Sequence, residues 1–185
     1  MHAGPPPSPW LQRWAHLISP GGTVLDVACG SGRHLRWLHE RGFVVTGVDR
    51  DAEALQPLAA LSETIVADIE GSPWPLAGRR FDAVLVTNYL WRPLTATLLD
   101  ALADGGVFIH ETFADGQQAF GKPSRPEFLL RPAELITMVG RRSGMRIVAF
   151  EDGRLDGPPR RVQRIVAVAG GSRPAALAGP AGAGG

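Results

Sequence analysis

The sequence has little of several things that would define a class of protein at once. Its 185 residues include one cysteine, Cys29, which excludes an internal disulfide and fits a reducing compartment. The formal net charge is +1, so no global electrostatic argument favours nucleic-acid binding. No apolar run approaches membrane-spanning length, and residues 1–9 lack the apolar segment of a signal peptide. These absences favour a cytoplasmic bacterial enzyme with neither nucleic-acid nor membrane partners.

What is present is the composition of an ordinary folded domain. Apolar residues make up 44% of the chain and charged residues 20%, which is typical of a globular protein with one core. The two ends differ from this middle. Residues 1–7 are rich in proline and are predicted to be a flexible arm, and residues 171–185 are mostly Gly, Ala and Pro and are predicted to be a disordered tail. The folded domain is therefore expected at residues 8–170.

Predicted strands and helices alternate along this domain. Apolar runs bounded by turn residues predict strands at 23–27, 43–48, 64–67, 81–87, 107–111, 145–151 and 162–169. Helical spacing predicts helices from Ser8-Pro9 to about residue 18 and at 33–41, 51–61, 92–103 and 132–141. The alternation indicates an α/β fold with a Rossmann-like, doubly wound, mostly parallel sheet. A short turn at 154–160 permits only a hairpin between the last two strands, so the last strand should be antiparallel.

The segment around which this fold is organised is residues 23–33, with the sequence TVLDVACGSGR. It reads as a short buried strand, a turn of small residues and the start of a helix. Gly30 and Gly32 allow a sharp turn and a close approach of the backbone to a ligand. Asp26 is an acid within an otherwise apolar strand, which is costly unless the carboxylate has a partner. The combination suits a ligand with cationic and amide-like groups.

The motif at 26–32, DVACGSG, resembles the first motif of class I S-adenosylmethionine-dependent methyltransferases, and the resemblance extends from about residue 10 to 169. The segments HETF at 110–113 and FGKPS at 120–124 are similar to small bacterial relatives of the tellurite-resistance methyltransferase. The resemblance implies a seven-stranded sheet of order 3-2-1-4-5-7-6. It also implies S-adenosylmethionine as the cofactor and methyl transfer as the reaction.

Candidate cofactor residues follow successive strands. Asp49 ends the second strand about twenty residues after the glycine turn, as expected of an acid that binds ribose hydroxyls. By the resemblance, Asp68 binds the adenine amine and Ile69 packs on the ring. The full predicted set is Asp26, Ala28, Gly30, Gly32, Arg33, Asp49, Arg50, Asp68, Ile69 and Asn88. Taken singly, Asp49 could instead cap the next helix, Asp68 could be a turn residue, and Arg33 with His34 could only face solvent.

Three residues near the predicted methyl group are catalytic candidates. Tyr89, the only tyrosine, follows the fourth strand, and His110 and Glu111 end the fifth. At most one of the adjacent pair should face the pocket, because neighbouring strand residues point to opposite faces. The alternative is a core histidine bonded to a loop carbonyl, with Glu111 tying down residues 112–130, which form a predicted lid. Lys122 and Arg125 in that loop could bind an anionic substrate or be solvated surface charge.

The resulting prediction is a methyltransferase that acts on a small molecule or metalloid by in-line displacement, without a metal. The residues NYLW at 88–91 differ from the motif of amino-group methyltransferases of DNA and protein, which disfavours macromolecular acceptors. An NAD-dependent oxidoreductase is the alternative enzyme, but Leu35 stands where its third glycine would be. A non-catalytic S-adenosylmethionine-binding module is the other alternative. The acceptor, the need for a general base, and a monomer or homodimer state stay open.

Overall fold

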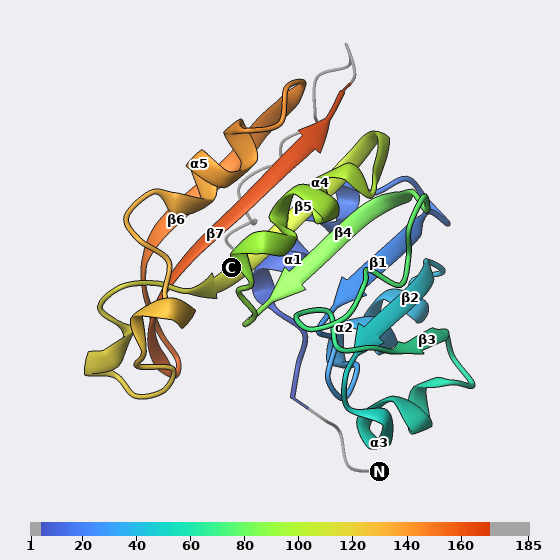
Figure 1. The fold of residues 1–185 in the computed structure, drawn as a ribbon, viewed down its shortest axis with the longest axis horizontal. Helices are drawn as coiled ribbons and strands as arrows, with labels where there is room; N and C mark the ends of the chain where they lie inside the picture. The colour runs from blue at the N-terminus through green and yellow to red at the C-terminus, as the bar shows by residue number, and fades with distance from the viewer. Residues whose placement is uncertain (1–4, 171–185) are drawn as a thin grey trace, which may run out of the picture.

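The sheet has the predicted strand order. A computed structural model describes residues 5–170; the predicted tail at 171–185 and residues 1–4 of the predicted arm lie outside the described residues. Between residues 5 and 170, seven strands form one sheet in the order β3-β2-β1-β4-β5-β7-β6 (Figure 1). Their bounds are β1 Thr23–Val27, β2 Val44–Asp49, β3 Glu63–Val66, β4 Phe81–Thr87, β5 Leu102–Phe113, β6 Met145–Asp156 and β7 Pro159–Ala169.

Strand direction also confirms the prediction. The pairs β1–β2, β1–β4, β2–β3 and β4–β5 are parallel, whereas β7 is antiparallel to both β5 and β6. In the register of the central strands, Asp26 lies between Gly47 and Leu85. The carboxyl ends of β1, β2, β3 and β4 therefore meet at one edge of the sheet, which is where open α/β sheets bind ligands.

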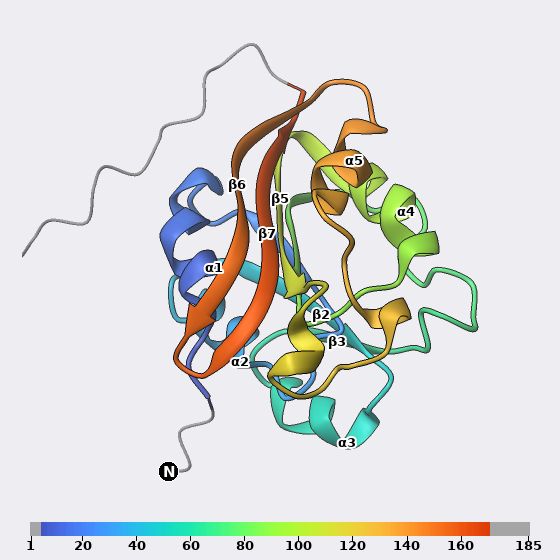
Figure 2. The same cartoon turned by 90° about the vertical axis from the view of Figure 1, so that its left-hand side faces the viewer.

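Helices cover both faces of the sheet. One face is covered by α1 (Pro9–Trp14), α2 (Arg33–His39) and α3 (Ala52–Leu55), and the other by α4 (Thr95–Asp100) and α5 (Glu134–Gly140). Figure 2 shows α1 and α2 on one side of the sheet and α4 and α5 on the other. The strands between them are buried on both faces, so β4 is a nearly continuous apolar run. No helix within residues 5–170 is long and apolar enough to cross a membrane.

The first helix begins where the sequence indicates. Ser8 is the N-cap, its side chain accepting a hydrogen bond from the Trp10 amide, and Pro9 occupies the first helical position. Trp10 and Trp14 are buried against the sheet. The helix continues as a 3₁₀ turn, Ala15–Leu17. Packing on the sheet is thus sufficient to explain the two tryptophans.

Several helices are shorter than predicted. The helix predicted at 51–61 ends as α-helix at Leu55 and tightens into a 3₁₀ turn, Gln56–Leu58, because Pro57 has no amide hydrogen to donate to the preceding turn. The helix predicted at 92–103 is a 3₁₀ turn, Arg92–Leu94, followed by α4, which ends at Asp100. The prediction was too long because helical spacing does not show where hydrogen bonding changes.

The turn predicted at 154–160 is wrong. Residues 154–156 and 159–160 pair with one another as the end of a long β6–β7 hairpin, and the chain reverses at Gly157-Pro158. The charged side chains of this stretch suggested a loop, but a hairpin that extends beyond the sheet can be polar on both faces. Its extra length carries Arg160 to the carboxyl edge of β5.

The segment predicted as a lid is fastened to the domain. Its first two residues, Thr112 and Phe113, belong to β5, and the rest contains two 3₁₀ turns, Gln117–Ala119 and Pro126–Phe128. The buried Gln117 side chain accepts a hydrogen bond from the Arg161 amide at 2.8 Å and donates one to the Lys122 carbonyl. Movement of this segment over an acceptor stays a prediction.

Candidate functional site

The glycine turn and the acid that ends β2 are in direct contact. The Gly30 amide donates a hydrogen bond of 2.7 Å to Asp49 Oδ2, and the Asp51 amide donates one of 3.0 Å to Asp49 Oδ1. Asp51, not Asp49, caps α3 by accepting from the amides of Glu53 and Ala54. The structure therefore gives Asp49 no capping role. It aims the carboxylate at the turn, with a lone pair on each oxygen still available.

The two predicted glycines have different physical roles. Both have positive φ, 52° for Gly30 and 73° for Gly32. A Cβ on Gly32 would lie 2.5 Å from Leu58 Cδ1, so this glycine is required by packing, whereas a Cβ on Gly30 would meet nothing within 4 Å. The turn thus leaves open space above Gly30, where a ligand can approach the backbone. Ala28 and Asn88 also have positive φ, 52° and 54°, and such strain gathers at functional sites.

A cavity of about 190 Å³ opens beside this turn. It is lined by Ala28, Asp49, Arg50, Ala67, Asp68, Ile69, Glu70 and Tyr89, and so unites much of the predicted cofactor set. Asp68 Oδ1 accepts hydrogen bonds from the Glu70 and Gly71 amides, which is the turn role considered for it, and Oδ2 accepts none from the described residues. A larger groove of about 610 Å³ lies between α4 and α5, but it contains none of the predicted residues.

Tyr89 contributes a buried hydroxyl to the cavity. The hydroxyl has no well-formed hydrogen bond to any residue between 5 and 170. Burial, and secondly the neighbouring carboxylate of Glu70, hold its pKa well above the ordinary value for tyrosine. A neutral phenol at this position can donate a hydrogen bond to a ligand, but it is poorly suited to act as a base.

Asp26 is a buried acid without a hydrogen-bond partner. Its side chain is fully buried, and neither carboxylate oxygen is hydrogen-bonded to any described residue. Burial raises the pKa of Asp26 to about 7, Arg33 opposes the shift, and Asp49 adds to it. His34 Nδ1 lies 4.0 Å from Asp26 Oδ2 and 3.3 Å from Thr87 Oγ1. A cationic group bound near Asp26 would favour its ionised form.

The suggestion that His34 faces solvent is wrong. Its side chain is buried beneath the glycine turn, because it lies on the sheet-facing side of α2. Burial lowers the pKa of His34 to about 3, so the ring is neutral. Arg33, the preceding residue, is half-buried and donates a hydrogen bond of 3.4 Å to the Pro6 carbonyl. That contact joins the start of α2 to the segment before α1.

His110 and Glu111 point to opposite faces of the sheet, as predicted. His110 faces α4 and α5: its ring packs edge-on against Phe108, and Nε2–H donates a hydrogen bond of 3.1 Å to the Tyr89 carbonyl. Burial lowers the pKa of His110 to about 4. A neutral histidine bonded to a loop carbonyl fits the structural alternative considered for it. A catalytic role for His110 stays a prediction without a contact that supports it.

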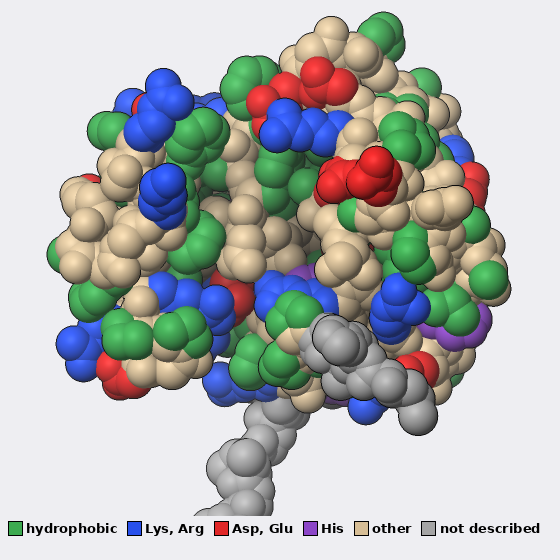
Figure 3. Space-filling view, turned by 90° about the horizontal axis from the view of Figure 1, so that it is seen from below, with side chains coloured by type: hydrophobic (Ala, Val, Ile, Leu, Met, Phe, Trp, Pro, Cys, Tyr) green, Lys and Arg blue, Asp and Glu red, His purple; other side chains and the backbone are tan. Residues whose placement is uncertain are grey.

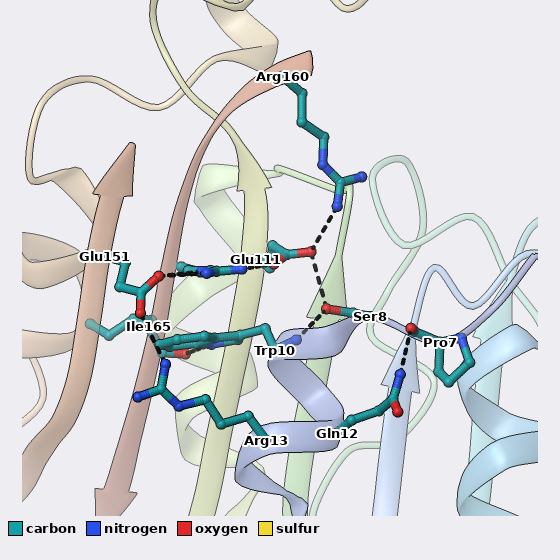
Figure 4. Close-up of polar contacts among 10 residues, drawn as sticks. Pro7, Ser8, Trp10, Gln12, Arg13, Glu111, Glu151, Arg160 and Ile165 are labelled. Atoms are coloured by element: carbon teal, nitrogen blue, oxygen red, sulfur yellow. Dashed lines mark hydrogen bonds and ion pairs between the residues drawn. The ribbon is translucent and has the colours of Figure 1, made fainter. Parts of the chain in front are cut away.

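Glu111 faces α1 and anchors the start of the chain. Its carboxylate accepts a hydrogen bond of 3.1 Å from Ser8 Oγ and lies 3.3 Å from Arg164 Nη1 and 3.7 Å from Arg160 Nη2. Figure 4 shows Glu111 between Ser8 and Arg160. The side chain is 1% exposed, so a carboxylate surrounded by these donors is first of all a structural charge. Both carboxylate oxygens of Glu111 have partners, so neither is free to act as a base, and its predicted catalytic role has no contact that supports it.

We expect Glu111→Gln to lower the free energy of unfolding by about 2 kcal/mol, because it removes the buried carboxylate that pairs with the half-buried Arg160 and Arg164. Urea denaturation measures the loss. Glu151→Gln is the matched control, since Glu151 pairs with Arg164 but its side chain is 44% exposed, and there the loss should be about 1 kcal/mol or less. Unchanged stability of Glu111→Gln together with lost turnover would instead favour the catalytic role.

Some residues of this edge were not predicted. Ser8 was identified only as a helix cap, and Arg160 and Arg164 were not identified at all. Arg160 and Arg164 lie on one face of β7, because alternate residues of a strand point to the same side. The other two cations considered, Lys122 and Arg125, are exposed, and Arg125 pairs with Glu127 at 3.0 Å. Within residues 5–170 no cluster of three or more His, Cys, Asp or Glu side chains could hold a metal ion.

Comparisons with known proteins agree with this arrangement. Residues 24–106 match a family described as a methyltransferase domain. No curated protein sequence matches the chain significantly. The crystal structure of TehB from Haemophilus influenzae is similar, with a TM-score of 0.66 and 18% identity over 84% of this chain and 59% of TehB. This chain therefore spans less than two thirds of TehB.

Two further crystal structures are similar over nearly their whole length. A methyltransferase from Methanosarcina mazei described as S-adenosylmethionine-dependent gives a TM-score of 0.67 at 15% identity, covering 89% of this chain and 99% of its own. The glycopeptide N-methyltransferase MtfA, complexed with S-adenosylhomocysteine, gives 0.61 at 19% identity, covering 85% and 87%. At these identities the likeness is one of fold.

Proposed function

We propose that this chain is an S-adenosylmethionine-dependent methyltransferase of class I that methylates a small-molecule or metalloid acceptor by in-line displacement; its match to a methyltransferase-domain family over residues 24–106 supports the proposal. The observation that carries the proposal is the contact between the Gly30 amide and Asp49 beside the cavity at the strand ends. It unites the glycine turn and the ribose-binding acid that the sequence places nineteen residues apart.

The residues present fit S-adenosylmethionine. The open space above Gly30 admits a ligand against the backbone, and Asp49 offers acceptor lone pairs to ribose hydroxyls. The half-buried Ile69 provides an apolar wall for the adenine, and Asp68 an acceptor for its amine. The unpartnered carboxylate of Asp26 is suited to an electrostatic interaction with the ammonium group of the cofactor. The ribose, the adenine and the ammonium group of the cofactor thus each have a chemically matched residue.

When bound, the cofactor supplies an activated methyl group with a good leaving group. The protein then has to align the acceptor, exclude water and, for a protonated acceptor, receive a proton. Neither His110 nor Glu111 lines the cavity, and the unpartnered Nδ1 of His110 belongs to a ring whose pKa is lowered by burial to about 4, which makes it a weak base. We therefore infer that the acceptor reacts in its unprotonated form or loses its proton to water, and that catalysis is mostly alignment.

The alternative functions are less well supported. An NAD-dependent oxidoreductase would need a third glycine where Leu35 is fully buried, with Gly47 beneath it. A non-catalytic module would bind S-adenosylmethionine but methylate no acceptor. Both are distinguished by the experiment below.

Isothermal titration with S-adenosylhomocysteine, with NAD as the control, tests the cofactor assignment. One-site binding of S-adenosylhomocysteine alone is expected, and an acceptor screen with S-adenosylmethionine then tests transfer. Binding of NAD in its place would contradict the proposal. Cofactor binding with no turnover on any acceptor would favour the non-catalytic module.

Tyr89→Phe should weaken S-adenosylhomocysteine binding about tenfold at unchanged stability. The hydroxyl that this substitution removes makes no well-formed hydrogen bond within residues 5–170, so it is available to the ligand. Calorimetry gives the affinity and urea denaturation the stability. An unchanged affinity would place the hydroxyl outside the cofactor site. A gain in stability at unchanged affinity would show that it is only an unsatisfied core group.

A further inference from the structure

Arginine side chains gather at the carboxyl edge of β5. Arg160 and Arg164 lie on β7, and Arg33 opens α2 from the neighbouring part of the sheet. All three have Glu111 near them. Figure 3, which looks onto the edge where the central strands end, shows arginine and lysine side chains around a hollow. The cluster is distinct from the cavity that contains Asp68 and Tyr89.

The guanidinium groups of this cluster are not equally paired with carboxylates. Arg164 is paired twice, since its Nε donates to Glu151 Oε2 at 2.8 Å and its Nη1 to Glu111. Arg160 has only Glu111, at 3.7 Å, and its Nε is buried without a hydrogen-bond partner among residues 5–170. Burial lowers the pKa of Arg33, and the charge of Arg160 lowers it further. The guanidinium groups of Arg33 and Arg160 thus act on each other; Arg33 has the carboxylates of Glu111 and Asp26 near it, whereas Arg160 has only Glu111, which is also bound to Ser8 and Arg164.

The cluster adjoins the proposed cofactor site. Arg33 directly follows Gly32 of the glycine turn, and the Asn88 amide at the end of β4 donates to the Glu111 carbonyl at 2.9 Å. The arginine cluster is therefore connected to the strand ends of the proposed cofactor site through the glycine turn and through Asn88. A guanidinium binds a planar or tetrahedral oxyanion through two parallel hydrogen bonds, and Arg160 has Nε available for one of them.

We propose that Arg160, assisted by Arg33, binds an oxyanion group of the acceptor, such as a carboxylate or a phosphate. Glu111 pairs with Nη2 of the same guanidinium at 3.7 Å and so helps to hold it in place. The inference rests on the proposed function for the identity of the ligand as the acceptor. The anion site itself rests only on the arginines.

Inorganic phosphate is the probe, titrated into the protein by calorimetry at constant ionic strength with and without saturating S-adenosylhomocysteine. Saturable binding is expected, and Arg160→Gln should weaken it about tenfold or more. The same variant should bind S-adenosylhomocysteine within about twofold of the wild type. Arg154→Gln is the matched control, because Arg154 lies on the same hairpin, is exposed and pairs with Asp156; it should leave phosphate binding unchanged.

The outcomes separate this inference from the proposed function. Absence of phosphate binding, or equal binding by Arg160→Gln in a protein folded by circular dichroism, overturns the anion site. Equal weakening of phosphate and S-adenosylhomocysteine overturns the assignment to the acceptor, because the arginine would then serve the carboxylate of the cofactor. Binding of phosphate that depends on Arg160, in a protein that binds no S-adenosylhomocysteine, supports the anion site and contradicts the methyltransferase proposal.

Discussion

Replacing Asp49 by alanine is expected to weaken S-adenosylhomocysteine binding about 100-fold. The carboxylate is the group proposed to hold both ribose hydroxyls, and charged acceptors make the stronger hydrogen bonds. The substitution also removes the acceptor of the Gly30 amide, so the turn loses the contact that fixes it against β2. Both effects lower the affinity of the protein for the ligand.

The loss of stability should be small by comparison. Asp49 is half-buried and accepts two backbone hydrogen bonds, each of which contributes about 1 kcal/mol net. Water can replace the carboxylate at this edge, because the amides that it binds adjoin the open cavity. We therefore expect a loss of about 1 kcal/mol by urea denaturation.

Asp51→Asn is the matched control. It removes a carboxylate two positions away, while asparagine caps a helix as well as aspartate does. Calorimetry should give this variant the wild-type affinity. Equal losses in both variants would mean that negative charge, and not the position of the Asp49 carboxylate, holds the ligand; an unchanged affinity in Asp49→Ala would refute the ribose role.

The second large effect is a gain of stability. Asp26→Asn should stabilise the ligand-free protein at pH 8 by up to about 4 kcal/mol relative to the wild type, and should weaken cofactor binding. Burial raises the pKa of Asp26 from 3.8 to about 7. Between these values the folded protein binds a proton that the unfolded chain releases, so the stability that Asp26 contributes falls as the pH rises from about 4 to about 7.

The pH dependence identifies the cause. Asparagine does not titrate, so the difference in unfolding free energy between variant and wild type should grow from pH 4 to pH 8. Taking this difference cancels the opposite contribution of the buried histidines His34 and His110, whose pKa values are lowered and whose stability is lost as the pH falls. If the unfolding free energies of variant and wild type changed in parallel with pH, ionisation of Asp26 would not destabilise the folded protein. Tighter cofactor binding by the variant would contradict the interaction with the ammonium group.

The parts of the site that the sequence predicts are local in the chain. Asp26, Gly30 and Asp49 lie within one β–turn–α–β unit, where spacing along the chain determines spacing in the fold. The strand order was instead implied by the resemblance to class I methyltransferases, and the structure has that order. The local sequence predicts which strands are buried, but not which polar side chains are. His34 follows Arg33 in a polar stretch and is nevertheless buried under the turn.

The parts that the sequence does not predict join distant segments. Ser8 and Glu111 are 103 positions apart, and no periodicity relates them. Arg160 stood in a predicted turn, since a hairpin that leaves the sheet has no buried face to impose an alternating pattern. The position of Arg160 depends on the length of β6 and β7, which is set by their pairing with each other.

The position of α1 has a consequence for the order of folding. The indole of Trp10 donates its hydrogen bond to the Ile165 carbonyl, 155 positions along the chain, and Arg164 lies over the same ring. Closing so long a loop costs conformational entropy that only a completed β5–β7 surface offsets. Although α1 precedes the sheet in the chain, it is therefore among the last elements of the domain to dock. Until β7 is synthesised, the indole of Trp10 has no Ile165 carbonyl to which it can donate, and part of the sheet face that α1 covers is missing. Apolar surface left exposed in this way is prone to contact with other chains.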